Sequence, residues 1–277
     1  MIRRILTIAG SDSGGGAGIQ ADLKVITLLG EYGLSVLTAL TAQNTLGVQA
    51  TYPIPPRMVE AQLLSVLTDI GADAGKTGML ATAAVVSVVA RAVRTYHITP
   101  LVVDPVMVAK DGSQLLSVPA IKRLREELLP LATVVTPNLA EAEILCGFSV
   151  RNVADMRRAA KAIIALGPKN VLIKGGHLSG PAVDLFYDGR SFKEFAAARQ
   201  TNANTHGTGC SFSAALTTFL AQGYPMPEAV AQAKSIITAA IAHGLALGAG
   251  IGPVNPHAYF HKRRKPVFAR TPRGGNR

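Results

Sequence analysis

The stretch Leu101-Val102-Val103-Asp104-Pro105 decides the fold class of this 277-residue chain. Its first three residues are continuously apolar, which indicates a strand that is covered on both faces, as in a parallel sheet. Asp104 then closes the strand with a polar side chain. Because ligands of open α/β sheets bind beyond the carboxyl ends of the strands, this stretch predicts both a sheet and the edge that carries the site.

Apolar strands and amphipathic helices alternate along almost the whole chain. We expect strands near residues 5–9, 34–40, 72–77, 101–104, 133–136, 171–174, 183–187 and 192–196. We expect helices near residues 17–29, 56–70, 82–96, 117–128, 138–146, 152–166, 209–222 and 226–247. This order predicts an α/β fold with an open, doubly wound, mostly parallel sheet and helices on both faces, in three α/β/α layers. No linker or internal repeat interrupts residues 1–261, so we expect one domain there and a tail at 262–277.

The positive charge is concentrated in that tail. The net charge of the chain is +11, and the tail holds seven Lys and Arg residues and no acidic residue. The remaining body is only mildly basic, which suits an enzyme of anionic ligands and argues against a nucleic-acid partner. We expect the tail, rich in Pro, Gly and Arg, to be disordered; a nucleic-acid-binding arm is the alternative.

The two cysteines, Cys146 and Cys210, argue against a disulfide framework, and no other Cys or His lies at metal-ligand spacing beside them. The apolar run after Arg3 and Arg4 is too short for a secretory signal. The longer apolar stretches contain charged or small polar residues and are typical of buried helices rather than membrane spans. We therefore expect a cytoplasmic protein with no membrane segment.

Polar residues follow several of the predicted strands. They are Ser11-Asp12-Ser13, Gln43-Asn44, Asp104, Thr136-Pro137-Asn138 and Lys174-Gly175-Gly176-His177. The carboxyl ends of parallel strands share one edge of the sheet, so these residues are expected to line one rim.

Residues 201–213 place a glycine-rich turn directly before a predicted helix, with Cys210 at the junction. Gly207 and Gly209 let backbone N–H groups converge without side chains in the way, and the helix adds its positive dipole end. Such a turn is a site for phosphate or for an anionic transition state. A thiol held there is expected to ionise easily. The alternative is a glycine-rich helix start with a buried structural cysteine.

Seven blocks, occurring in this order, resemble those of one family. They are IAGSDSGGGAGIQADLK (8–24), TALTAQNT (38–45), KTGML (76–80), DPVM (104–107), TPNLAEA (136–142), KGGH (174–177) and NTHGTGC (204–210). The chain resembles the hydroxymethylpyrimidine/phosphomethylpyrimidine kinases of thiamine biosynthesis, which have the ribokinase-like fold. The resemblance covers about residues 4–260 and leaves out the tail.

The resemblance implies phosphorylation of 4-amino-5-hydroxymethyl-2-methylpyrimidine, and then of its monophosphate to the diphosphate. Both steps use ATP and Mg²⁺, while activation by a monovalent cation is left open. The usual assembly of the family is a homodimer. The nearest alternative is a pyridoxine/pyridoxal kinase of the same fold, or an enzyme with both activities. A sugar or nucleoside kinase fits less well, because the wider superfamily usually has aspartate in the place of Cys210.

The resemblance assigns one part of the site to the substrate ring. Gln43 resembles the residue that recognises the pyrimidine, and an amide that can both donate and accept suits an aminopyrimidine edge. Asp22 is a candidate for a further polar contact, with an exposed acid in a first helical turn as the alternative. The pocket wall is expected to include Gly10, Ala17, Met79 and Val106, for which ordinary core packing is the alternative.

A second part of the site concerns the phosphates. The amides of Gly207, Thr208, Gly209 and Cys210 are expected to hold the transferred group, and Cys210 is the candidate base. Asp104 and Glu141 are candidates for organising Mg²⁺, which favours few carboxylates plus phosphates. A strand-end cap and an acid in a first helical turn are the alternatives for these two carboxylates. The expected ATP-binding residues are Lys174, Asn138 and Lys234; Asn138 is also a candidate N-cap.

Overall fold

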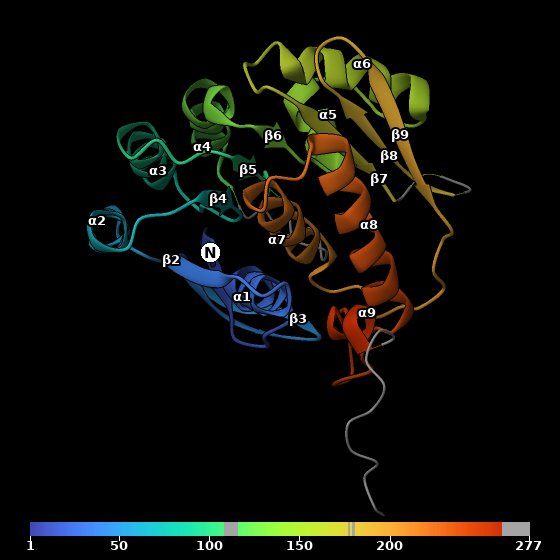
Figure 1. The fold of residues 1–277 in the computed structure, drawn as a ribbon, viewed down its shortest axis with the longest axis horizontal. Helices are drawn as coiled ribbons and strands as arrows, with labels where there is room; N and C mark the ends of the chain where they lie inside the picture. Colours follow the sequence, from blue (N-terminus) through green and yellow to red (C-terminus); the bar gives the residue numbers. More distant parts are fainter. Residues whose placement is uncertain (108–115, 177, 179–180, 262–277) are drawn as a thin grey trace, which may run out of the picture.

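The computed structural model describes residues 1–107, 116–176, 178 and 181–261. These residues form one nine-stranded sheet in the order β3-β2-β1-β4-β5-β6-β7-β8-β9 (Figure 1). The strands are β1 (Arg4–Asp12), β2 (Tyr32–Asn44), β3 (Gly47–Pro53), β4 (Ala74–Thr77), β5 (Leu101–Val103), β6 (Val134–Val135), β7 (Val171–Gly175), β8 (Ala182–Tyr187) and β9 (Phe192–Ala197). The neighbours from β2 to β7 pair parallel, and only β2–β3, β7–β8 and β8–β9 pair antiparallel. The mostly parallel sheet predicted from the sequence is confirmed.

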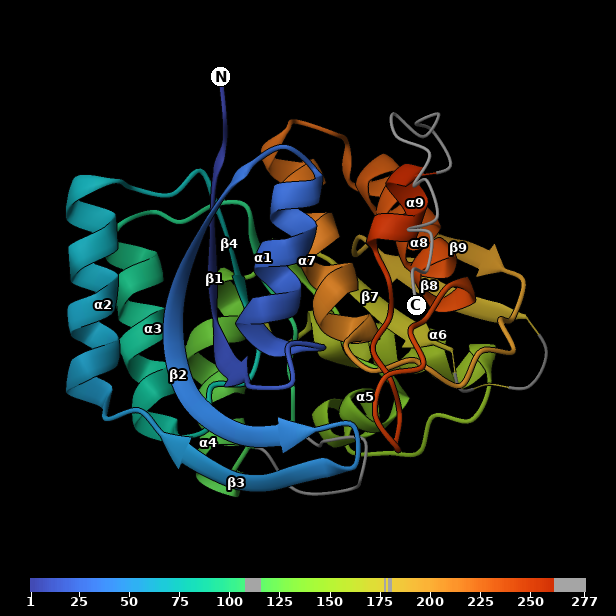
Figure 2. The same cartoon turned by 90° about the horizontal axis from the view of Figure 1, so that it is seen from below.

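Helices cover both faces of this sheet, as the views in Figures 1 and 2 show. One face carries α1 (Gly18–Leu28), α7 (Thr208–Ala221) and α8 (Met226–Ala242). The other carries α2 (Pro56–Asp69), α3 (Ala83–Thr95), α4 (Val118–Arg123), α5 (Leu139–Cys146) and α6 (Val153–Ile164). The three layers expected from the alternating pattern are therefore present, with the short α9 (His257–His261) packed on α8.

The strand β5 shows why a continuously apolar run is required. Leu101 and Val103 belong to the core beneath α3 and α4, whereas Val102 between them belongs to the core beneath α7 and α8. All three side chains are fully buried. Since successive side chains of a strand point to opposite faces, a central strand between two helical layers has no solvent-exposed position, and a polar residue there requires a buried partner.

The strand β3 was not predicted, and β2 runs four residues beyond its expected end. Six of the seven residues between Gly47 and Pro53 form antiparallel pairs with β2, yet none of these seven residues is buried. An edge strand that is covered on neither face has no hydrophobic periodicity for the sequence to display. Its pairing with β2 shifts register between Ala42 and Gln43, which is the mark of a β-bulge.

The chain beyond α8 returns to the rim of the sheet. The helix expected at 226–247 ends at Ala242, and the following loop is fastened to the turn after β2 by a hydrogen bond from Ile251 N to Thr45 O (2.9 Å). The tail at 262–277, with its expected disorder, lies outside the described residues. No helix among the described residues is long and apolar enough to span a membrane.

Candidate active site

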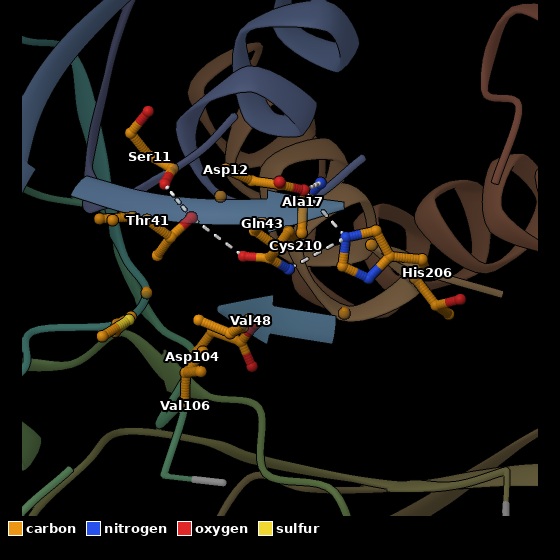
Figure 3. Close-up of a pocket in the computed structure, with 18 of the residues that line it drawn as sticks. Ser11, Asp12, Ala17, Thr41, Gln43, Val48, Asp104, Val106, His206 and Cys210 are labelled. Carbon is orange, nitrogen blue, oxygen red and sulfur yellow. Dashed lines mark hydrogen bonds and ion pairs between the residues drawn. The ribbon is translucent and has the colours of Figure 1, made fainter. Parts of the chain in front are cut away.

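A cavity of about 300 Å³ opens at the carboxyl ends of the parallel strands (Figure 3). All but two of the site residues predicted from the sequence line it. Those that do are Gly10, Ala17, Gln43, Met79, Asp104, Val106, Asn138, Glu141, Lys174, Gly207, Thr208, Gly209 and Cys210. The two that do not are Asp22 and Lys234.

The glycine-rich turn forms the start of α7, and Gly207 is its N-cap residue. Gly207 has φ +77°, and a Cβ on it would lie only 1.7 Å from the carbonyl oxygen of Gly16. No side chain caps this helix end; Thr208 N donates a long hydrogen bond to Thr205 O (3.4 Å), and the amides of Gly209 and Cys210 remain available to a ligand. The geometry is that of an anion-binding helix N-terminus.

An ion pair lies directly against this turn. Lys174 Nζ is 2.9 Å from Asp104 Oδ1, and a Cβ on Gly209 would be 3.5 Å from Lys174 Nζ. Burial would raise the pKa of Asp104, but the ammonium groups of Lys174 and Lys76 outweigh it and hold that pKa below its usual value. Burial would likewise lower the pKa of Lys174, but Asp104 and Glu141 outweigh it and raise that pKa. Both groups are therefore charged at neutral pH.

Glu141 and Asn138 line the cavity next to this ion pair, since Asn138 forms a parallel β-bridge with Lys174. They form a capping box at the start of α5: Glu141 N donates to Asn138 Oδ1 (2.9 Å) and Asn138 N donates to Glu141 Oε2 (2.8 Å). Both residues thus have the structural task of a helix cap while lining the cavity. Burial raises the pKa of Glu141 to about 7, with Asp104 adding to the effect and Lys174 opposing it.

The donor set fits a magnesium ion that arrives with a nucleotide. Among the described residues no group of three or more His, Cys, Asp and Glu side chains is placed to hold a metal ion by itself. Asp104 and Glu141 are nevertheless two buried carboxylates on one cavity. Mg²⁺ is commonly held by one or two carboxylates together with phosphates and water, so a two-carboxylate site requires the phosphates to complete it.

The pKa of Glu141 predicts a pH dependence. We expect kcat/KM to rise as the pH increases through about 7, because the free enzyme then acquires the carboxylate that attracts a cation. Glu141→Gln, which keeps the capping acceptor, should lower kcat/KM and flatten this rise. The free energy of unfolding should change in the opposite direction and fall as the pH rises. The pKa of Glu141 in the folded protein, about 7, exceeds the ordinary 4.5, so its stabilising contribution is present at low pH and is lost by about pH 7. A Glu141→Gln profile with an unchanged ascending limb would contradict the assignment.

Cys210 faces the cavity from the first turn of α7, beside Gln43 (Figure 3). Burial raises the pKa of its thiol to about 11, against the opposing charge of Lys76 and with support from Asp22 and Asp104. The prediction of an easily ionised thiol is therefore wrong for the free protein. The reason is that removal of water from the sulfur outweighs the favourable helix start.

Asp22 does not reach the cavity, contrary to its predicted role beside the substrate ring. It is fully buried and accepts hydrogen bonds from Lys76 Nζ, at 3.0 Å to each carboxylate oxygen, and from Thr7 Oγ1 (2.6 Å). A lysine inside a sheet requires such a partner, and Lys76 is itself fully buried in β4. The acid in the first turns of α1 is thus structural.

Lys234 is also placed away from the nucleotide position predicted for it. It is buried in α8, and its Nζ lies 2.6 Å from Asp184 Oδ2. Asp184 Oδ1 in turn accepts from the amide of Gly175 (3.1 Å), directly after Lys174. The ion pair joins α8 to Asp184 in β8, which in turn is bonded to the end of β7, and it does not line the cavity.

We predict that Asp22→Asn lowers the free energy of unfolding by about 3–5 kcal/mol, because it leaves the buried Lys76 without its counter-charge. Chemical denaturation monitored by circular dichroism measures this. Asp73→Asn is the matched control, because Asp73 is paired with Arg4 at the surface and its loss should cost no more than about 1 kcal/mol. Equal effects of the two variants would contradict the structural role of Asp22.

Sequence analysis placed Asp12 on the rim without a role and gave His206 no role in the site. Asp12 accepts hydrogen bonds from the amides of Gly14, Gly16 and Ala17 (2.8–3.0 Å), and so it holds the loop between β1 and α1. His206 Nε2 lies 2.9 Å from Asp12 Oδ2. The only signals in the sequence were their positions, one at a strand exit and the other next to Gly207. Their contact joins residues 194 positions apart and needs the fold.

The solved structures most useful for comparison are two kinases. The ADP complex of Bacillus subtilis pyridoxal kinase superposes with a TM-score of 0.88 at 43% identity, covering 93% of this chain and 98% of that one. The phosphomethylpyrimidine kinase of Clostridium difficile superposes with a TM-score of 0.77 at 44% identity, covering 86% of this chain and 98% of that one. The fold and the site therefore define a kinase of the ribokinase-like class.

Sequence comparison identifies the family. A family described as phosphomethylpyrimidine kinase matches residues 12–255. A hydroxymethylpyrimidine/phosphomethylpyrimidine kinase of Streptomyces coelicolor is 52% identical over 251 residues, which are 91% of this chain and 93% of that protein. A thiamine biosynthesis bifunctional protein of Geobacter sulfurreducens is 54% identical over 252 residues, and the chain spans about half (51%) of its length. The chain belongs to the phosphomethylpyrimidine kinase family.

Proposed function

We propose that this protein phosphorylates 4-amino-5-hydroxymethyl-2-methylpyrimidine, and then its monophosphate, with ATP as the phosphoryl donor in thiamine biosynthesis. The observation that carries the proposal is a single cavity with two kinds of recognition group. Gln43, the start of α7, which no side chain caps, and the ion pair of Asp104 and Lys174 all line it. A ring with a primary alcohol and a polyphosphate can therefore meet there.

The chain's residues supply positioning and charge. The amides of residues 207–210 hold the transferred phosphoryl group while the substrate hydroxyl oxygen attacks phosphorus and the bond to the β-phosphate oxygen breaks. Lys174 neutralises negative charge on the phosphates, and Asp104 keeps Lys174 charged and in place. When bound, Mg²⁺ neutralises further phosphate charge, and Asp104 and Glu141 are the residues that would hold it. Asn138 orients Glu141 through the capping box.

Cys210 is proposed to accept the proton of the substrate hydroxyl, which requires its thiolate. In the free protein burial outweighs the charge of Lys76 and raises the pKa to about 11, so the role requires ligand binding to lower that pKa. We predict that Cys210→Ala lowers kcat by about 10²-fold with little change in KM, since a general base contributes about 10²–10⁴-fold. Steady-state kinetics measure this, and Cys146→Ala at the end of α5 is the matched control. A kcat for Cys210→Ala within threefold of wild type would contradict the role of Cys210 as a base, and catalysis would then depend on positioning and charge alone.

A pyridoxine/pyridoxal kinase is the second candidate, because the Bacillus subtilis pyridoxal kinase superposes over almost the whole chain. Turnover should be measured with the hydroxymethylpyrimidine, its monophosphate, pyridoxal and pyridoxine, each with ATP and Mg²⁺. The first proposal expects the highest kcat/KM for the pyrimidine and measurable turnover of its monophosphate. Turnover of pyridoxal alone would replace it with the second.

We further propose that residues 1–261 form a ribokinase-like kinase domain and that two copies assemble as a homodimer. Family resemblance supports both statements. Sedimentation analysis of the full chain tests the assembly. A variant ending at residue 261 should keep the kcat/KM of the full chain.

A further inference from the structure

We propose that Thr41, His206 and Asp12 are positioning residues that fix the orientation of the Gln43 side-chain amide, and thereby the pocket's preference for an aminopyrimidine over a hydroxypyridine. We call these four residues the amide relay. The inference rests on the proposed function, because it takes Gln43 as the group that contacts the substrate ring. Figure 3 shows the Gln43 amide lying between Thr41 and His206 on the wall of the cavity.

The backbone holds Gln43 firmly at this wall. Next to the cavity, Ala42 pairs with Ala50 and Gln43 with Val48, so the extra residue of the bulge is Gln49 of β3 and Gln43 keeps its place in the β2–β3 ladder. Gln43 N donates to Ser13 Oγ (2.8 Å), and Ser13 Oγ donates to Gln43 O (2.9 Å). The remaining freedom of the residue is therefore in its side chain, and above all in which end of the amide points to Thr41.

The single hydroxyl proton of Thr41 decides what its oxygen can offer to Gln43. Thr41 Oγ1 donates to the carbonyl oxygen of Ser11 (2.8 Å), and it lies 3.1 Å from Gln43 Oε1. One proton cannot serve both oxygens at full strength. When Thr41 donates its proton to the carbonyl oxygen of Ser11, its oxygen has only lone pairs left for Gln43. The NH₂ end of the Gln43 amide is then the better partner for Thr41.

His206 makes the complementary demand at the other end of the amide. Its Nε2 is 2.9 Å from Asp12 Oδ2 and 3.4 Å from Gln43 Nε2. Burial would raise the pKa of Asp12, but hydrogen bonds from His206 and the loop amides hold that pKa below its usual value, so Asp12 is an acceptor. His206 Nε2 therefore carries a proton, which it donates mainly to Asp12 Oδ2. A protonated ring nitrogen cannot accept from the amide NH₂ group, whereas the amide oxygen can share its N–H weakly, so the oxygen is the better match at this end.

Both demands are met when the amide turns by 180°, so that NH₂ faces Thr41 and the oxygen faces His206. The second N–H and the second lone pair of the amide then face the ligand in one fixed order. An aminopyrimidine edge offers a ring nitrogen acceptor beside an amino donor, which pairs with both ends of the amide. A 3-hydroxypyridine with a neighbouring aldehyde presents only oxygen acceptors on that edge once its hydroxyl is ionised, and the Gln43 oxygen is then left without a donor. An unpaired polar group is the usual source of such discrimination.

Thr41→Val tests the relay, because it preserves shape and removes the hydroxyl that selects the NH₂ end. Dissociation constants for the hydroxymethylpyrimidine and for pyridoxal are measured by calorimetry without ATP, and kcat and KM are measured with ATP. We expect the preference for the pyrimidine to fall by about tenfold, through dissociation constants and KM rather than kcat. Thr41→Ser should restore the wild-type preference. Thr51→Val is the matched control, because exposed Thr51 pairs with Thr41 across the β2–β3 ladder.

A Thr41→Val preference within twofold of wild type would overturn the relay, and so would an equal fall in Thr51→Val. If Thr41→Val does not fold, Thr41→Ala serves under the same criteria. Wild-type turnover of pyridoxal alone would instead refute the proposed function. The ratio of dissociation constants tests the relay even then, since it does not depend on turnover.

Discussion

Gly207→Ala should lower kcat by at least about 10²-fold. A loss of about 10²–10³-fold is expected when a preorganised anion-binding turn is displaced. The added Cβ would lie 1.7 Å from the carbonyl oxygen of Gly16, and φ +77° is strained for alanine. The first turn of α7 must therefore move away from the loop that Asp12 holds. Activity per folded molecule and the free energy of unfolding are the two measurements.

The same helix offers a matched control for this change. Gly223, just beyond the end of α7, has φ +89° and no heavy atom within 4 Å of an added Cβ. Gly223→Ala should therefore cost about 1–2 kcal/mol of stability from backbone strain alone, with kcat within twofold of wild type. Retention of more than a tenth of kcat in Gly207→Ala would contradict the anion-binding role of the turn.

Asp104→Asn should lower kcat/KM by about 10²–10³-fold, because it removes the carboxylate that lies beside the phosphate-binding turn and pairs with Lys174. It also leaves the charges of Lys174 and Lys76 less compensated, so the variant should demand a higher Mg²⁺ concentration for half-maximal rate. Steady-state kinetics over a range of Mg²⁺ concentrations measure both effects.

Asp184→Asn is the control for the loss of a buried carboxylate as such. Asp184 is buried and paired with Lys234, as Asp104 is buried and paired with Lys174, but it does not line the cavity. Both variants should lose stability, and only Asp104→Asn should lose most of its activity. Equal losses of kcat/KM would mean that Asp104 acts through the fold rather than through the reaction.

The sequence predicted which residues gather at the site better than it predicted the partners and the protonation of their side chains. Strand exits such as Gln43, Asp104 and Lys174 lie on one rim because parallel strands share one carboxyl edge. Asp22 and Lys234 were misplaced because a charged residue in an amphipathic helix looks the same in sequence whether it faces a ligand or a buried counter-charge. Each is paired with a residue 50 or more positions away, and no local pattern records such a partner.

The order of apolar strands and amphipathic helices determined the three-layer fold without further information. The reason is that the hydrophobic periodicity of each helix or strand depends only on residues close together in the chain. The glycines of residues 201–213 likewise determined where α7 starts, since only glycine tolerates the backbone required there. Tertiary structure alone decided the high pKa of Cys210, the edge strand β3 and the contact of Asp12 with His206. Each of these depends on what covers or faces a group across the fold, and that is set by burial and by distant neighbours rather than by adjacent residues.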